Sequence, residues 1–168
     1  MRVLGIDPGT RTLGFGVVEM RAGVLRHVSH GTVCVPGDVP LAMRLARMRA
    51  GIDDVMREQE PAAVAVEGLF YARNVRSALV LAHARGVALE VAAARGLAVA
   101  EYSPMEVKRG LVGYGRATKD QVARMVQRLL ALGSLPSTDA ADALALSICH
   151  IHAARLNGLL SRRGARRR

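Results

Sequence analysis

The order of the short apolar segments constrains the fold of this chain more than any other feature. Three strand-like segments follow one another at residues 2–6, 14–20 and 24–35, with only short turns between them. Strands joined in this way predict an antiparallel meander, in which Gly31 would be a bulge or a break in the third strand. Beyond residue 41, helical periodicity alternates with short apolar strands. This order predicts an α/β fold, with a five-stranded mixed sheet flanked by helices.

The second part of the chain contributes the predicted helices. The spacing of apolar residues predicts helices at 41–60, 76–95, 118–132 and 137–155, and strands at 63–66 and 97–102. Pro104 would open a short helical turn, and the glycines within 110–115 predict a flexible loop. We find no internal repeat and no linker before the arginine-rich end of the chain.

The chain is 168 residues long, which favours one compact domain. It contains 24 Lys and Arg against 14 Asp and Glu, a formal net charge of +10, and 51% of its residues are hydrophobic. Because so apolar a chain can bury a core, a disordered basic protein is excluded. Five of the last seven residues are Arg. We therefore expect a folded domain over 1–156 and a basic, disordered tail over 157–168 that is attracted to polyanions.

A second concentration of positive charge lies between residues 108 and 128. Six basic residues stand there against one acid, Asp120. This count favours a nucleic-acid surface, but solvated helix faces in an arginine-rich chain would produce it too, so charge alone leaves both interpretations open. The only two lysines of the chain belong to this stretch, which consists of Lys108, Arg109, Arg116, Lys119, Arg124 and Arg128.

Cysteine usage and hydropathy bear on the compartment. Cys34 and Cys149 are far apart and lack metal-ligand spacing, so we expect no disulfide framework. Cys149 stands near His150 and His152, but adjacent helical positions point to different faces, so we interpret all three as packing residues. The chain opens with no leader-like succession of charged, apolar and small residues, and it has no apolar run near about 18 residues. We expect a cytoplasmic protein without a membrane span.

The helix predicted at 76–95 is apolar around most of its circumference. From Ala78 to Ala94, only His83, Arg85, Gly86 and Glu90 interrupt its apolar surface. One face of a sheet cannot cover a helix that is hydrophobic on all sides. Either a further helix or a second subunit must therefore cover its outer side, and periodicity alone does not decide between them.

Four carboxylates are placed where an ionised side chain needs a partner. Asp7 ends the first predicted strand and Glu67 the fourth, and both would emerge at one sheet edge if these strands are neighbours. Asp139 and Asp142 lie three residues apart at the start of the last helix, hence on one face of it. Turn chemistry before Pro8 would also account for Asp7, and helix capping and the helix dipole would account for Asp139 and Asp142. Glu67 is the hardest to explain structurally, because it ends an otherwise apolar strand.

A cluster of these carboxylates predicts a metal site. Mg²⁺ or Mn²⁺ requires hard oxygen ligands, since these ions take carboxylates together with water and phosphate oxygens. Two such ions about 4 Å apart can activate a water and stabilise the leaving 3′ oxygen in phosphodiester hydrolysis. An acidic metal pocket in a chain of charge +10 is typical of a nuclease.

Five segments of this sequence are distinctive in combination. They read GIDPGTRTLGFGVV at 5–18, VEGLFYARN at 66–74, SALVLAHARGVAL at 77–89, VKRGLVGYGRATKDQV at 107–122 and DAADALALSICH at 139–150. In order, and over nearly the whole chain up to the tail, they resemble the RuvC family of bacterial Holliday-junction resolvases. The DPGT segment by itself is also close to what ribonuclease H-like folds in general contain.

This resemblance implies a ribonuclease H-like fold and a homodimer that acts on four-way DNA junctions with Mg²⁺ or Mn²⁺. The catalytic acids of the family fall on Asp7, Glu67, Asp139 and Asp142, and its dimer helix corresponds to 76–95. The second subunit therefore becomes the favoured cover for that helix. A two-fold dimer presents two identical sites, so it can nick two strands of like polarity and leave ligatable ends. A branch-migration motor is the expected partner.

The resemblance also implies DNA contacts. The family's DNA-stacking phenylalanine falls on Phe70, although an aromatic that anchors the loop is the plainer interpretation, and Tyr71 would assist it. Lys108 and Lys119 fall on positions that hold or polarise a phosphate near the site, unless they are ordinary surface lysines. Further backbone contacts would come from Arg73, Asn74, Arg76, Arg116 and Arg124.

The sequence therefore predicts a metal-dependent, structure-selective endonuclease that leaves 5′-phosphate and 3′-hydroxyl ends. A junction-binding architectural protein without catalysis is the alternative, and the presence of all four acids disfavours it. The sugar-kinase and actin-like ATPase branch of the fold also places an Asp-Gly-Thr turn after its first strand, but its two lobes do not fit in 168 residues.

Overall fold

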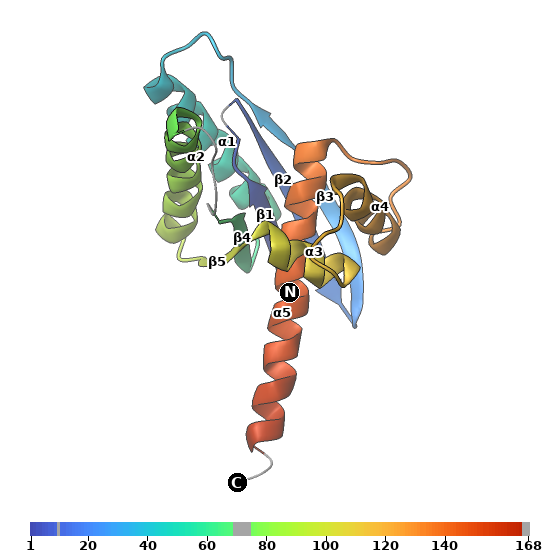
Figure 1. The fold of residues 1–168 in the computed structure, drawn as a ribbon. Coiled ribbons are helices and arrows are strands. Elements are labelled where there is room, and N and C mark those ends of the chain that lie inside the picture. Colours follow the sequence, from blue (N-terminus) through green and yellow to red (C-terminus); the bar gives the residue numbers. More distant parts are fainter. Residues whose placement is uncertain (10, 69–74, 166–168) are drawn as a thin grey trace.

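One five-stranded sheet forms the centre of the computed structural model, which describes residues 1–9, 11–68 and 75–165 (Figure 1). Its strands are β1 (Arg2–Asp7), β2 (Thr12–Arg21), β3 (Val24–Cys34), β4 (Ala63–Glu67) and β5 (Ala98–Tyr102). They lie in the order β3-β2-β1-β4-β5, and the β3-β2 and β2-β1 pairs are antiparallel. The β1-β4 and β4-β5 pairs are parallel. The predicted mixed sheet, a meander with parallel additions, is confirmed.

Helices cover both faces of the sheet (Figure 1). They are α1 (Leu41–Gln59), α2 (Val75–Ala94), α3 (Pro104–Val112), α4 (Lys119–Leu129) and α5 (Thr138–Ala165). One hydrophobic core joins α1 and α2 to the sheet, and a second joins α3, α4 and α5 to the opposite face. Among the helices of the described ranges, none is long and apolar enough to cross a membrane.

The alternation of side chains along β1 and β4 decides which residues reach α5. Leu4 and Ile6 are buried in the core under α1 and α2, whereas Val3 is buried in the core under α5. Successive strand residues point to opposite faces, so Asp7 belongs to the α5 face. The same alternation along β4 buries Ala65 on the α5 side and places Glu67 there as well. Both strand-end carboxylates are thereby directed to the face covered by α5.

Glycines allow α5 to lie unusually close to the sheet. A Cβ added at Gly5 would stand 1.9 Å from the Ala143 carbonyl oxygen, and one at Gly14 would stand 2.1 Å from the Asp139 carbonyl oxygen. Gly5 pairs with Gly16 across the β1-β2 ladder, so the flat patch spans two strands. No other residue fits such contacts, because real Cβ atoms do not approach backbone so closely. The first turns of α5 are thus held against the ends of β1 and β2.

The irregularity in β3 differs from the prediction. The register between β2 and β3 shifts between Val17 and Val18, which places the extra residue at Val28 rather than at Gly31. Gly31 pairs regularly with Phe15 and makes room for its ring, since a Cβ there would stand 3.0 Å from two ring carbons. Gly31 is therefore a site of side-chain packing and not a break in the strand.

The predicted loop over 110–115 is partly wrong. Helix α3 begins at a capping box formed by Ser103 and Glu106 and continues to Val112, and Gly113 then ends it in the left-handed conformation at φ 93°. Gly110 lies inside the helix, where a Cβ would stand 3.1 Å from the Cys149 sulfur. Gly113, rather than Gly110, therefore ends the helix.

The last helix extends past residue 156, the predicted end of the folded domain. Helix α5 continues from Thr138 to Ala165 and projects beyond the rest of the domain (Figure 1). Once its first half is packed against the sheet, each further residue adds a hydrogen bond without a new nucleus, and Leu, Arg and Ala favour helix. Residues 166–168 lie outside the described part.

Candidate active site

The carboxyl ends of two parallel strands bring Asp7 and Glu67 together. The β1-β4 register pairs Gly5 with Ala65 and Ile6 with Val66, so the next step along both strands places these two acids side by side. Their carboxyl groups share a hydrogen bond. The Gly68 amide donates to the Tyr102 carbonyl oxygen at 2.9 Å and ties the end of β4 to β5.

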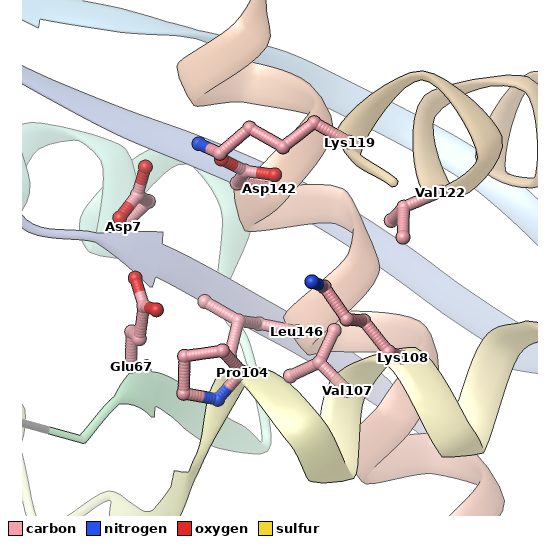
Figure 2. A pocket seen from close by; sticks show the side chains of 9 residues that line it. All are labelled: Asp7, Glu67, Pro104, Val107, Lys108, Lys119, Val122, Asp142 and Leu146. Atoms are coloured by element: carbon pink, nitrogen blue, oxygen red, sulfur yellow. The ribbon is translucent and has the colours of Figure 1, made fainter. Parts of the chain in front are cut away.

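Helix α5 contributes the other two acids. Asp142 lines a pocket with Asp7 and Glu67, and Figure 2 shows the three carboxylates gathered at one side of it. Asp139 lies one turn earlier and does not line this pocket, but it is close enough for its charge to act on Asp7. The contacts of Gly5 and Gly14 with the backbone of α5 set the distance between this helix and the sheet, and hence the position of both acids.

The pocket combines an acidic side with a basic and an apolar side. Its volume is about 230 Å³. Besides the three carboxylates, it is lined by Lys108, Lys119, Pro104, Val107, Val122 and Leu146 (Figure 2). The apolar residues come from α3, α4 and α5, which all cover the same face of the sheet. These helices form the apolar wall beside the ionisable groups.

The pKa of Asp7 shows how much negative charge this site concentrates. Burial is the largest influence, followed by the charges of Glu67 and Asp142, the hydrogen bond that the protonated Asp7 donates to Glu67, and the charge of Asp139. Together they raise the pKa of Asp7 to about 8. Like charges that share a low-dielectric site cannot all ionise without a cation. The cluster therefore retains a proton near neutral pH or requires positive charge from elsewhere.

Lys119 supplies positive charge directly. It is the first residue of α4, whose start is fixed by a capping box between Thr118 and Gln121. Its Nζ donates to Asp142 Oδ2 at 2.7 Å, and this hydrogen bond raises the pKa of Lys119. Within the described ranges, Lys108 lines the same pocket without an ion pair to any carboxylate.

The donor chemistry of the four acids fits a divalent metal ion. Carboxylate oxygens are the ligands that Mg²⁺ and Mn²⁺ prefer. The pKa of Asp7 is raised by burial and by the neighbouring carboxylates, and a bound cation would offset that negative charge. As the side chains stand, no three His, Cys, Asp or Glu groups among the described residues are close enough together to hold an ion. Ligation by three of these carboxylates at once would therefore require them to move towards one another, whereas one or two carboxylates with water already suffice for Mg²⁺.

The predicted DNA contacts fall in different places. Arg116 precedes α4 and Arg124 lies on it, and both are exposed without lining the pocket. Arg76 lies in the first turn of α2, and its side chain is outside the described part. Phe70, Tyr71, Arg73 and Asn74 also lie outside the described residues.

The residues around Cys149 make packing contacts, as interpreted from the sequence. Its sulfur donates to the Glu106 carbonyl oxygen at 3.8 Å, and His150 Nδ1 is hydrogen-bonded to the Tyr102 hydroxyl at 2.8 Å. His152 Nδ1 lies 3.2 Å from the Gly110 carbonyl oxygen. Because each side chain has a different partner, the three do not converge on one point.

Arg85 is a residue whose role at the site was not predicted. It lies on α2, and its Nε donates to the Glu67 carbonyl oxygen at 3.3 Å. Its guanidinium also forms an ion pair with Glu101 of β5 and is only 16% exposed. An arginine within an otherwise apolar helix was the available signal, because a mostly buried charge needs a partner.

Comparisons with known proteins agree with this geometry. The family model for the crossover junction endodeoxyribonuclease RuvC matches residues 3–150. A crossover junction endodeoxyribonuclease RuvC of Syntrophomonas wolfei is 47% identical over 161 residues, which cover 95% of this chain and 94% of the relative.

Solved structures show the same fold. The structure of T. thermophilus RuvC in complex with Holliday junction substrate has 38% sequence identity and a TM-score of 0.88, and the match covers 94% of this chain and 96% of that one. The yeast mitochondrial Holliday junction resolvase Ydc2, at 12% identity, shares the fold with a TM-score of 0.66 over 89% of this chain and 78% of that one. From the family match and the identity over nearly its whole length, this chain belongs to the RuvC family of crossover junction endodeoxyribonucleases.

Proposed function

We propose that this chain resolves four-way DNA junctions in recombination and repair by metal-dependent cleavage at the pocket between β1, β4 and α5. The observation that carries this proposal is the joint presence of Asp7, Glu67 and Asp142 with two lysines in one pocket of a strongly basic protein. Membership of a nuclease family that depends on divalent metal ions supports it.

The four acids would hold Mg²⁺ or Mn²⁺, two ions in each site. Divalent ions bound there would activate a water and stabilise the leaving 3′ oxygen, so that 5′-phosphate and 3′-hydroxyl ends result. The parallel strand register, which brings Asp7 and Glu67 together, supports this assignment, as does the spacing of Asp139 and Asp142 in the first turns of α5.

The lysines of the pocket would act on the substrate phosphate. Lys108 and Lys119 line the pocket from α3 and α4, and both side chains extend into it (Figure 2). An ammonium group is a compact donor that can stabilise charge developing on a phosphate oxygen. The bases and the flanking backbone would be contacted by a wider set, namely Phe70, Tyr71, Arg73, Asn74, Arg76, Arg116 and Arg124.

A homodimer through α2 would place two such sites for symmetric nicking. The outer side of α2 is apolar and exposed, with Val75 and Leu79 at 75% and 56% exposure. A groove between α1 and α2 is lined by Leu45, Leu79, Ala82, His83, Gly86, Val87 and Glu90. Exposed apolar patches of this kind mark interaction surfaces. A branch-migration motor remains the expected partner, and the cytoplasm the expected compartment.

The cleavage proposal is tested with a labelled four-way junction, incubated with and without Mg²⁺ or Mn²⁺. We expect the wild type to cut only with a metal ion, and Asp7→Asn to lose about a thousandfold in rate or more. Asp38→Asn, which removes an exposed carboxylate away from the pocket, is the matched control. A wild type that binds the junction but never cuts it would instead identify the architectural alternative, a junction-binding protein without catalysis.

The dimer is tested by gel filtration. Leu79→Glu should shift the protein to the monomer, whereas Leu135→Glu, at an exposed leucine outside α2, should not. A wild type that is monomeric at every concentration would contradict symmetric nicking by one dimer.

A further inference from the structure

The two lysines of the pocket differ in what they touch. Lys119 Nζ lies 2.7 Å from Asp142 Oδ2, while Lys108, within the described ranges, has no carboxylate at ion-pair distance. Figure 2 shows Lys119 extending from α4 with its ammonium group beside Asp142. One carboxylate of the acidic cluster is therefore already occupied by a cation from the protein.

The backbone holds this cation in place. The Thr118 hydroxyl oxygen accepts a hydrogen bond from the Gln121 amide, and the Thr118 amide donates one to Gln121 Oε1, which fixes the first turn of α4. Lys119 is the next residue after Thr118, so the position of its Cα is fixed by this turn. Its side chain is 70% exposed while that of Asp142 is 24% exposed, so the lysine can swing out into solvent and the aspartate cannot.

Lys119 and a metal ion would compete for the carboxylate of Asp142. Asp7 and Glu67 line the same pocket and attract a cation, Asp139 adds negative charge close to Asp7, and Lys108 lines the pocket from α3. A carboxylate oxygen that accepts a short hydrogen bond from an ammonium group offers less to a metal ion, and the two cations repel one another. In the arrangement described, the ammonium of Lys119 already occupies Asp142 Oδ2.

We propose that Lys119 is a resident counter-ion for Asp142, which a divalent metal ion displaces when it binds, leaving the ammonium free to contact the DNA phosphate. This inference rests on the proposed function, because it assumes that Asp142 is a metal ligand. Lys119 would then have two opposing effects. It weakens metal binding in the absence of DNA, and it supports cleavage when DNA is bound.

The test measures Mn²⁺ binding by the DNA-free protein, from the electron paramagnetic resonance signal of free Mn²⁺. Lys119→Met should bind Mn²⁺ roughly tenfold more tightly than the wild type, since competitor and repulsive charge are both removed. Lys119→Arg keeps the ion pair and should stay within about twofold of the wild type. Lys108→Met is the matched control, because it removes the same charge from the same pocket without an ion pair, and we expect a change of less than about threefold.

The outcomes separate this inference from the proposed function. If the wild type binds Mn²⁺, Asp142→Asn loses that binding and Lys119→Met leaves it unchanged or weaker, the counter-ion role is wrong while the metal site stands. If the wild type does not bind Mn²⁺ saturably, or if Asp7→Asn leaves that binding unchanged, the proposed metal site is wrong. This inference is then wrong as well. If Lys119→Met binds more tightly but cuts the junction more slowly, both roles are supported.

Discussion

The face of the sheet under α5 and the face under α1 and α2 are packed in different ways. Under α5, Gly5 and Gly14 let a helix backbone lie directly on the strands, and ionisable groups stand at the strand ends. Under α1 and α2, Leu4 and Ile6 fill the space with large apolar side chains. Alternate residues of the same strands serve both purposes. A site built from two strands and a helix needs a short, fixed separation between them, whereas a core needs only filled volume.

The largest expected effect comes from filling the glycine contact. Gly5→Val should lower the free energy of unfolding by about 3 kcal/mol or more, because its Cβ would overlap the Ala143 carbonyl and α5 would have to move. Ile6→Val, the next residue on the opposite face, should cost only about 1 kcal/mol. Urea unfolding followed by circular dichroism measures both. Equal costs for the two variants would remove the distinction between the faces.

The acidic site should also make the α5 face sensitive to pH. The carboxyl of Asp7 titrates at its ordinary value of 3.8 when unfolded and at about 8 when folded, so the folded state retains a proton that the unfolded state has released. The metal-free protein should therefore lose stability, by a few kcal/mol, as the pH rises from about 4 to about 8, and then level off.

Urea titrations at several pH values measure this dependence. Asp7→Asn should flatten it, and Asp38→Asn should not. A wild-type profile without a slope in this range would mean that the site does not hold the proton.

Arg85 connects the two faces and should have an intermediate effect. Arg85→Ala removes the donor to the Glu67 carbonyl and leaves Glu101 without its partner, so we expect a loss of about 2 kcal/mol and slower cleavage. Arg95→Ala breaks an ion pair with Asp53 on the α1 side, and Arg95 is more exposed than Arg85, so this change should cost less and leave cleavage unchanged. If both variants cut at the wild-type rate, Arg85 acts in stability alone.

The smallest effect is expected where α5 leaves the sheet. Gly158 has open space around its Cα, in contrast to the glycines beneath the same helix. Gly158→Ala should therefore raise helix content slightly and stabilise the protein by less than about 1 kcal/mol. Circular dichroism and thermal melting would detect it. A loss of stability would show that the projecting part packs against something.

Much of the fold could be predicted from the pattern of residues. Local periodicity identified the strands and the helices. The length of each connection predicted the strand direction, because short turns join antiparallel strands and parallel strands need a long crossover. The errors have local causes. Gly31 resembled a break but accommodates Phe15, and Gly110 resembled a loop but packs inside α3 against Cys149. The same residue type serves flexibility or close packing, and only the neighbours in space distinguish the two uses.

The candidate site was predictable as a set of acids but not as a geometry. Asp7 and Glu67 could be placed at one sheet edge, because strands that end in an acid are conspicuous in an apolar context. The ion pair between Lys119 and Asp142 joins residues 23 apart in sequence, and the bond from Arg85 reaches a backbone oxygen. Contacts of this kind leave no periodic signal, so no spacing rule finds them.

The sequence by itself determined the class of fold, the family and the inventory of acids and lysines, because these depend on residue identity and on local order along the chain. The tertiary structure alone decided that Asp7 is buried among like charges, that Lys119 pairs with Asp142 while Lys108 does not, and that α5 continues to Ala165. The reason is physical: desolvation and Coulomb energy depend on distances and burial, which are set by packing between segments remote in sequence.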